Sequence, residues 1–571
     1  MKNEAWLDIG PLSDIPEDRP VLRKAGGKRF ACVRAGDAVH AIDDRCPHQG
    51  YPLSQGSCKE GVLTCEWHNW KFDLGSGECL FGGEAVRRYP TRIQDGRVHL
   101  HTAVDAEREA ARLRTGLSQA LMRDEMGRAL REALRLGQVT EHPRSAELGP
   151  LAAAFELVAQ DGAQRAEYGF DHALAVFADL TSWIARGWIG AEEAFVAAMH
   201  AVAEPSLHLP ARKVAPAGAA PEDALDPAGA CDALLAERRD EAEARVRAIA
   251  RSRGADTAKA LVPFLARHLH DYGHGAIFTA KAAEIAARFP AIGEDVFGSL
   301  AVSLAWATAE TALPPFTATR AALERLEAVT LPAPSAEPLD PAERASYERA
   351  ILSGEAPGAN ATVDLLTRGA DPRSLLLAAA HAAAERIARF DIAWEDRLDA
   401  EVGVLDVTHT LTFAESALVL ADGASPRDAA RLAVLAAAFT GKVKNGDRAD
   451  TTDPAPRTSA PDLLSAARAR DAGRAIAIAR EMSPSERRAA YAELAPFAAF
   501  DAATRPIFYA HTIKNTEALH RLEHADPFAG ATYLVALLSY IVPPRRELRV
   551  RRVAHIAKKF LADGRPPEGL Y

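Results

Sequence analysis

The sequence predicts a multidomain protein in which a small N-terminal all-β domain is followed by a large all-α domain. Up to about residue 103, short runs rich in Val, Ile, Phe and Leu are separated by turn dipeptides, which is typical of strands. From about residue 105, Ala, Leu, Arg and Glu dominate, and apolar residues recur at helical spacing. A chain of 571 residues also exceeds what one hydrophobic core usually supports, so several folding units are expected.

Two turn dipeptides indicate where the β domain forms hairpins. Gly36-Asp37 lies between two short apolar runs in "KRFACVRAGDAVHAI", and Asp95-Gly96 does the same in "YPTRIQDGRVHLH". Such dipeptides favour the tight turns whose twist matches that of paired strands. We therefore expect two antiparallel hairpins around these positions.

The remainder of the chain shows a helical stripe from its start, at Leu113, Leu117 and Leu121. Three stretches rich in Pro, Ala and Asp lack periodicity and are predicted to be linkers or long loops: 213–230, 331–341 and 444–462. The predicted domains are therefore 1–104 and 105–571, with possible helical sub-blocks at 105–212, 228–330, 342–443 and 463–571.

Charge and hydropathy exclude some classes of partner. The net charge of -10 and the pI near 6.0 argue against a general nucleic-acid binder, which would present a basic face. The most apolar stretches, "SLLLAAAHAAAERIA" and "ATYLVALLSYIVPP", are shorter than the roughly 18 apolar residues of a membrane span. No apolar signal segment follows the first residues "MKNEAWLDIG". We expect a cytoplasmic protein without nucleic-acid or membrane partners.

The cysteines are crowded at the N-terminus. Five of the six lie within the first 80 residues, at Cys32, Cys46, Cys58, Cys65 and Cys79, and the sixth is Cys231. In a reducing compartment this crowding indicates metal ligands or buried thiols and not a disulfide scaffold.

Four residues form a spaced motif for an iron–sulfur centre. Cys46-x-His48 is followed after sixteen residues by Cys65-x-x-His68. In a [2Fe–2S] centre with two thiolates on one iron and two imidazoles on the other, the reduction potential rises to about -150 to +300 mV. A zinc ribbon with the same four ligands is the alternative, although ribbon ligands usually come as Cys-x-x-Cys pairs.

This segment resembles the Rieske ferredoxin family, the small electron carriers and N-terminal modules of aromatic-ring oxygenase systems. The resemblance covers roughly residues 5–101 and includes "GVLTC" before the second loop and "WHNWKFDLGSGE" around it. It implies that Cys46 and Cys65 bind the inner iron, and that His48 and His68 bind the outer iron.

Two departures from the wider family bear on the type of centre. High-potential Rieske proteins carry a second Cys in each loop, but Tyr51 and Trp67 stand in that vicinity here, so the resemblance is to the low-potential branch. Carriers of this branch usually cover the cluster with a Pro-containing loop. The corresponding region, "ECLFGGEAVRRYP", has Gly82-Gly83 instead, so either the cluster is more open there or the helical domain covers it.

The helical domain does not carry the facial-triad pattern of ring-hydroxylating oxygenases, Asp-x-x-His-x4-His. It does repeat a His pattern in "HGAIFTAKAAE" from His274, "HTLTFAESALV" from His409 and "HTIKNTEALHR" from His511. In each segment the His is followed by a small residue, two variable positions, then Phe or Asn. This pattern predicts a second metal site, although core histidines in duplicated hairpins would give the same repeat.

Carboxylates accompany these histidines at helical spacing. Glu415 and Glu517 lie six residues after His409 and His511, and Asp271 and Asp406 lie three residues before His274 and His409. A carboxylate and a His at i and i+3 share a helix face, as in di-iron helix bundles. The pair His270-Asp271 in "LHDYGHGAIFTA" also resembles the HD-superfamily signature, although its other two ligands are not evident.

The predicted function is that of an iron–sulfur oxidoreductase. In the first hypothesis the Rieske centre delivers single electrons to a mono- or dinuclear non-haem iron in the helical domain, which oxidises a small organic substrate with O₂. The candidate ligands of that iron are His270, Asp271, His274, His409, Glu415, His511 and Glu517. In the second, the protein is an electron carrier whose helices are a docking scaffold for a separate oxidoreductase. Dinucleotide, Walker and haem motifs are absent, so an external reductase or ferredoxin is the expected electron donor. An oligomer is compatible with both hypotheses.

Overall fold

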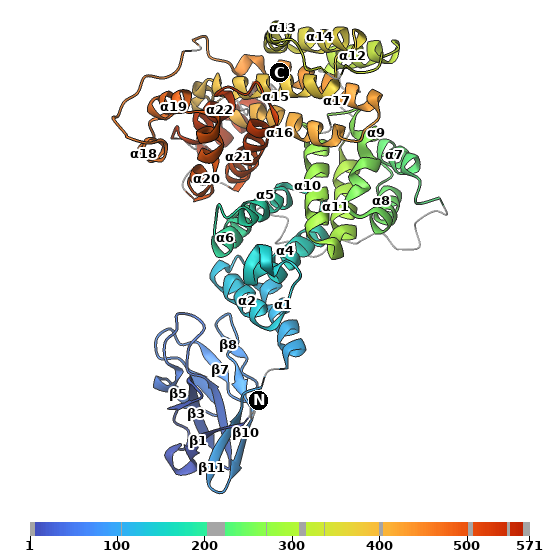
Figure 1. Cartoon of the computed structure of the whole chain (residues 1–571). Helices are drawn as coiled ribbons and strands as arrows, with labels where there is room; N and C mark the ends of the chain where they lie inside the picture. Colours follow the sequence, from blue (N-terminus) through green and yellow to red (C-terminus); the bar gives the residue numbers. More distant parts are fainter. Residues whose placement is uncertain are drawn as a thin grey trace. The chain divides into compact units, whose positions relative to one another are not determined.

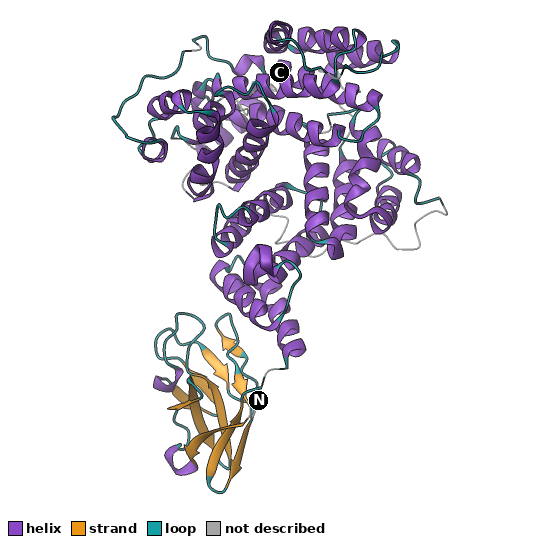
Figure 2. Cartoon of the chain, in the orientation of Figure 1, coloured by secondary structure: helices purple, strands orange, loops and turns teal. Residues whose placement is uncertain are grey.

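The computed structural model describes most of the chain. The described residues are 6–103, 105–202, 223–269, 271–307, 316–335, 337–398, 403–450, 452–500, 506–544 and 549–563. All named strands lie before residue 102, and the described elements after residue 105 are almost entirely helical (Figure 2). The chain therefore has an N-terminal β-sheet domain followed by a predominantly helical region, as the sequence predicts.

The β domain contains three small antiparallel sheets, with strand orders β1-β11-β10, β2-β3-β4-β9 and β5-β6-β7-β8. The strands are β1 Trp6–Pro11, β2 Val21–Ala25, β3 Lys28–Ala35, β4 Ala38–Asp43, β5 Ser57–Lys59, β6 Val62–Thr64, β7 Lys71–Asp73, β8 Cys79–Phe81, β9 Arg88–Tyr89, β10 Thr91–Gln94 and β11 Arg97–His101. Both expected hairpins form, β3–β4 around Gly36 and β10–β11 around Asp95-Gly96. Asp95 and Gly96 both have positive φ, which explains why a Gly is needed in so tight a turn.

The helical elements begin directly after the last strand. The helices are α1 Ala106–Met122, α2 Met126–Val139, α3 Ser145–Leu148, α4 Ala152–Arg165, α5 His172–Ala185, α6 Ala191–Val202, α7 Pro227–Leu235, α8 Arg239–Arg253, α9 Thr257–Leu265, α10 His274–Arg288, α11 Gly293–Trp306, α12 Thr317–Glu327, α13 Pro341–Ser353, α14 Glu355–Thr367, α15 Pro372–Ala388, α16 Val404–Ala421, α17 Pro426–Lys442, α18 Leu463–Arg468, α19 Ala472–Glu481, α20 Pro484–Phe500, α21 Pro506–Ala525, α22 Thr532–Ile541 and α23 Arg549–Asp563. Figure 1 labels most of them.

The chain divides into two compact units, Met1–Glu141 and His142–Tyr571. Helices α1 and α2 belong to the first unit, so its boundary lies later than the predicted one at residue 104. The physical reason is that α2 contributes Arg131 and Arg135, which bind the buried Glu84 of the β domain. Of the predicted linkers, the described residues of 331–341 and 444–462 are largely irregular. In the first one, residues 213–222 lie outside the described residues, and 227–230 already form the start of α7.

Four helices of the second unit pack in a ring, in the order α5, α10, α16 and α21, with α21 returning to α5. Residues at the same position along neighbouring helices contact each other. His172 on α5 contacts His274 on α10, and seven residues further along each helix Asp179 pairs with Lys281. The four helices therefore run in the same sense. Parallel neighbours need long connections, and the intervening helices supply them.

One of these four helices is long and apolar. Within the part of the chain that the structure describes, α16 alone has the length and hydropathy that a membrane crossing requires, and 78% of the apolar window is buried in the protein. Its apolar character is explained by neighbours on several sides, since α16 packs against α10 and α21 within the ring and against α15 and α17 outside it. His409 contacts His274 of α10, and Phe413 contacts Phe439 of α17.

Close packing between α14 and α17 predicts that Gly441→Ala destabilises the helical unit. A Cβ at Gly441 would lie 2.4 Å from the carbonyl oxygen of Gly354 and 2.8 Å from the amide nitrogen of Glu355, so backbone would have to move. We expect the free energy of unfolding, measured by chemical denaturation with circular dichroism, to fall by about 1–3 kcal/mol. Gly293→Ala is the matched control, since its Cβ would only touch Ala286 at 3.4 Å, and we expect a change within about 0.5 kcal/mol. An equal effect of the two variants would contradict this packing argument.

Candidate metal centres

The two loops that carry the Cys-and-His motif share the same pattern of backbone hydrogen bonds. In the first, the amide of Cys46 donates to the carbonyl of Tyr51, and the amide of Gly50 donates to the carbonyl of Cys46. In the second, Cys65 and Trp70 make the first bond, and Asn69 and Cys65 make the second. Gly50 and Asn69 both have positive φ, at the fourth position after the Cys. Each loop is thus a tight turn that returns on its own Cys and presents the His at its tip.

The side chains on these loops fit a [2Fe–2S] cluster. Cys46 and Cys65 are buried in the same core cluster, and all six cysteines are free thiols. The His48 and His68 rings lie 4.5 Å apart, with His48 less exposed than His68. The Nδ1 atom of His48 is buried without a hydrogen-bond partner among the described residues, as expected for a ligand nitrogen. Burial raises the pKa of Cys46 to about 12, and a bound metal ion is what would hold such a thiol as thiolate.

Further residues of the first unit fix the outer side of this site. The indole of Trp70 stacks on the His48 ring at 4.8 Å with an angle of 7° between the planes. A Cβ at Gly82 would lie 2.4 Å from the Trp70 ring, so only glycine lets this loop approach. A Cβ at Gly83 would lie 3.4 Å from the carboxylate of Glu125, which precedes α2. The region where a Pro-containing loop is usual is therefore packed against the α1–α2 hairpin of its own unit.

A second candidate centre lies in the helical unit, where four imidazoles converge. His172 and His274 are the first residues of α5 and α10, and His409 and His511 lie in the second turn of α16 and α21. One ring nitrogen from each of the four lies within 4.8 Å of the others. The Nε2 atom of His274 is 3.2 Å from that of His172 and 3.0 Å from that of His409, and the Nε2 atoms of His409 and His511 are also 3.0 Å apart.

Backbone hydrogen bonds decide which nitrogen each ring presents. The Nδ1 atoms of His274, His409 and His511 lie 2.5, 2.6 and 2.7 Å from the carbonyl oxygens of Asp271, Leu405 and Ile507. Only a protonated Nδ1 can donate to a carbonyl, so in a neutral ring Nε2 carries the lone pair. The contacts at 3.0 Å then bring lone pairs together, which is unfavourable unless a cation lies between them. A backbone carbonyl that holds the distal nitrogen is the usual support of a metal-bound His.

The environment keeps three of these imidazoles neutral. Burial, and then the positive charge of Lys514 or of neighbouring histidines, holds the pKa of His172, His409 and His511 well below its usual range. A neutral imidazole is the form that binds a metal ion. The site is therefore ready for a divalent metal such as iron or zinc, both of which imidazole suits.

Lys514 is a buried amine beside this site, one turn after His511 on α21. It is 1% exposed, and its Nζ atom has no hydrogen-bond partner among the described residues. Burial lowers its pKa to about 7, although the carboxylate of Asp179 opposes the shift. A second helix thus supplies a carboxylate that balances part of the charge near the four-His site.

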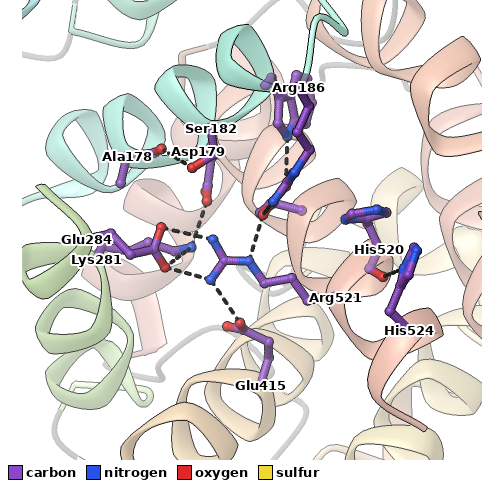
Figure 3. Close-up of polar contacts among 12 residues, drawn as sticks. Ala178, Asp179, Ser182, Arg186, Lys281, Glu284, Glu415, His520, Arg521 and His524 are labelled. Carbon is purple, nitrogen blue, oxygen red and sulfur yellow. Dashed lines mark hydrogen bonds and ion pairs between the residues drawn. The ribbon is translucent and has the colours of Figure 1, made fainter. Parts of the chain in front are cut away.

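The structure brings together three of the predicted ligands, His274, His409 and His511, and places the predicted carboxylates elsewhere. Asp271 supplies its carbonyl to His274, with a carboxylate oxygen 3.3 Å from the same Nδ1, and Asp406 caps the N-terminus of α16. Glu415 pairs with Arg521 (Figure 3), and Glu517 binds Arg186, Trp183 and Arg521. These two glutamates lie too far along their helices to meet the imidazoles. His270 lies outside the described residues.

Sequence reasoning missed His172. Its segment, "HALAVFADL", has Phe at the fifth position after His instead of the fourth, so it does not match the repeat. A different signal was present, because His172 precedes His274 by 102 residues and His409 precedes His511 by the same interval. The two intervals relate α5–α10 to α16–α21.

Comparison with known proteins relates the β domain to Rieske proteins. The Rieske [2Fe-2S] domain model matches residues 5–90. The chain is 37% identical over 98 residues to the anthranilate 1,2-dioxygenase ferredoxin subunit of Burkholderia cepacia, which is 17% of this chain and 91% of that protein. It is 38% identical over 86 residues to the 4beta-methylsterol monooxygenase of Methylococcus capsulatus, which is 13% of this chain and 23% of that enzyme.

Among solved structures, the ferredoxin of carbazole 1,9a-dioxygenase from Nocardioides aromaticivorans is similar over 18% of this chain and 100% of its own length. The identity is 23% and the TM-score is 0.17. The part of this chain that is similar to the two relatives, 17% and 13% of its length, is about as long as the β domain.

The convergence of the four imidazoles predicts that His511→Ala abolishes binding of the second metal. Loss of one of four ligands and of its support should reduce the metal retained to below about a tenth of one equivalent, as measured by elemental analysis after dialysis. The two irons of the cluster, followed by their visible absorption, provide an internal standard. His520→Ala is the matched control, because His520 lies on the same helix but outside the four-His group. Equal metal content in the two variants would show that the four imidazoles do not bind it.

Proposed function

Because the chain belongs to the Rieske [2Fe–2S] family through residues 5–90, we propose that it is a Rieske-dependent oxidoreductase with a non-haem iron site in its helical unit. The cluster would receive single electrons and deliver them to iron held by His172, His274, His409 and His511. The observation that carries the proposal is the convergence of the four Nε2 atoms, three of them in rings whose Nδ1 is tied to a backbone carbonyl.

Iron is proposed for the second site because the same chain also carries a one-electron donor, the [2Fe–2S] cluster. Four imidazoles suit several divalent metals, zinc included. A one-electron donor in the same chain has a use only if the second metal changes oxidation state, which zinc does not. Non-haem iron supplied with electrons would activate dioxygen for the oxidation of a small organic substrate.

The residues of this chain have separate tasks in that chemistry. The carbonyls of Asp271, Leu405 and Ile507 orient the rings. Burial in the helix ring lowers the pKa of His172, His409 and His511, which keeps these three imidazoles neutral. In the first unit, Trp70 holds His48 in place against the exposed His68. The exposed side of His68 is the surface through which electrons would enter the cluster.

The electron donor is proposed to be an external reductase or ferredoxin. Relatives of the β domain are named as ferredoxin subunits of dioxygenase systems, which supports a role in electron transfer between partners. The substrate is proposed to be a small organic molecule, with O₂ as the oxidant.

The alternative, an electron carrier whose helices only dock another enzyme, makes a different prediction about the histidines. Under that hypothesis the His side chains are structural, and the protein holds cluster iron alone. Lone pairs facing one another at 3.0 Å argue against a purely structural role, since a core histidine would pair its nitrogen with a donor.

The test is the rate at which the reduced cluster is reoxidised by O₂. In the iron-loaded wild type, electrons leave the cluster for the second site, so we expect rapid bleaching of the reduced-state signal after mixing with O₂. In His409→Ala the cluster remains but its electron acceptor is lost, and we expect reoxidation to slow at least ~10-fold (about 1.4 kcal/mol in the barrier). Stopped-flow absorbance and freeze-quench paramagnetic resonance would follow both.

Two controls make the result specific. His520→Ala removes a half-buried His from the same helix as His511 and should reoxidise at the wild-type rate. Cys65→Ser should lose the cluster while retaining the second metal. If the cluster of His409→Ala is reoxidised as fast as that of the wild type, the cluster does not pass electrons to the four-His site. That result would favour the electron-carrier hypothesis.

A further inference from the structure

A row of charged side chains, Asp179, Lys281, Glu284 and Arg521, is joined by ion pairs (Figure 3), on three of the helices that carry the four histidines. The Lys281 ammonium donates to Asp179 at 2.6 Å and to Glu284 at 3.2 Å. Arg521 then binds both carboxylate oxygens of Glu284, at 2.6 and 2.9 Å. The side chains of Asp179, Lys281 and Glu284 are 0%, 5% and 23% exposed, so the row runs from the interior to solvent.

The buried end of the row lies close to the proposed iron site. Asp179 follows His172, and Lys281 follows His274, by seven residues, which places both about 10 Å further along helices that run in the same sense. Lys514 follows His511 by three residues, so along the helix axis it lies between the imidazoles and the pair Asp179–Lys281. The charge of Asp179 raises the pKa of Lys514 and that of Lys281 lowers it. Lys514 thus stands between the row and the imidazoles.

Asp179 has the properties of a group that holds a proton. Its Oδ2 atom is buried without a hydrogen-bond partner among the described residues, so one oxygen can carry hydrogen. Burial raises its pKa to about 7, while Lys281 opposes the shift. The other charged groups that act on it are Glu284 from α10 and Lys514, Glu517 and Arg521 from α21.

We infer that Asp179, Lys281 and Glu284 form a proton pathway between solvent and the four-His site. The inference rests on the proposed function, because oxygen activation consumes protons that the Rieske cluster does not supply. When one oxygen atom enters a C–H bond of the substrate, the other leaves as water after taking two electrons and two protons. The electrons come from the external donor through the cluster, and the protons come from water through this row.

Within the row, Lys281 is in contact with both Asp179 and Glu284, and beyond Asp179 the buried amine of Lys514 lies between the row and the imidazoles. The Asp179 carboxyl first breaks its O–H bond and passes its proton towards the Lys514 amine. Lys281 then breaks an N–H bond to reprotonate the Asp179 carboxylate, and it takes a proton back from Glu284, which receives one from a solvent hydronium ion. Glu284 carries this proton only in passing, because Lys281 and Arg521 lower its pKa to about 2. Arg521 remains protonated throughout and only holds Glu284 in position. Glu415, on the far side of Arg521, is therefore outside the pathway although it also pairs with Arg521.

The protonated carboxyl of Asp179 can be observed directly by infrared spectroscopy of the full chain. In the metal-free wild type we expect a carbonyl band of a buried carboxylic acid that disappears with a midpoint near pH 7, and Asp179→Asn should lack it. Zn²⁺ is a redox-inert probe that imidazoles bind. Its positive charge should lower the midpoint in the wild type by about one unit or more. A midpoint that Zn²⁺ leaves unchanged would overturn the link between Asp179 and the metal site.

The route is tested by the rate at which the same band shifts after rapid mixing with D₂O, well below the midpoint, where Asp179 is protonated in every variant. Glu284→Gln removes the solvent end of the pathway and should slow this exchange at least ~10-fold. Glu415→Gln removes a carboxylate with the same arginine partner and should exchange at the wild-type rate. Equal rates in the two variants would show that protons reach Asp179 by another way.

These measurements need neither turnover nor iron, so they separate the two proposals. If Asp179 titrates and exchanges as expected but the chain retains no second metal from iron-containing medium, the proposed function fails and the proton row stands alone. If iron binds and accepts electrons while Asp179 stays ionised at neutral pH, the proposed function survives and the proton pathway is wrong.

Discussion

The second half of this protein depends on one constraint, the bond from a histidine Nδ1 to the carbonyl about one turn before it on the same helix. His409 and His511 make this bond to the fourth preceding residue, and His274 makes it to the third, across the turn before α10. The bond fixes both the tautomer and the ring direction, so α10, α16 and α21 each direct a lone pair to one point. The ring of four helices then brings those points together.

Along the axis of this four-helix ring, neutral and charged side chains occupy different positions. The imidazoles lie nearest the helix N-termini, and burial lowers the pKa of His172, His409 and His511, which keeps these three neutral. Carboxylates and cations follow further along the helices, and most of them pair with a neighbouring helix, as Lys281 does with Asp179, whereas the Lys514 amine has no hydrogen-bond partner among the described residues. Burying unpaired charge is costly, whereas a paired network can be tolerated in a core. This separation keeps anionic ligands away from the proposed iron, whose protein ligands are then all neutral.

The two centres differ in how their ligands are held. In the β domain, short loops closed by their own backbone bonds present two Cys and two His, and the site needs few contacts from elsewhere. In the helical unit every ligand comes from a different helix, and the positions of those helices depend on the whole core. A local motif therefore identifies the first centre, whereas long-range packing creates the second.

The sequence itself determined the β hairpins, the helical remainder and the spacing of Cys46, His48, Cys65 and His68, because these features depend on residues near one another in the chain. It also indicated His274, His409 and His511, through a repeat that reflects equivalent positions on the helices. Only the tertiary structure decided that His172 completes the set and that Glu415 and Glu517 belong to an ion-pair network. The reason is physical: a helix face tells which residues point the same way, but contacts across 102 or 135 residues depend on how the helices pack.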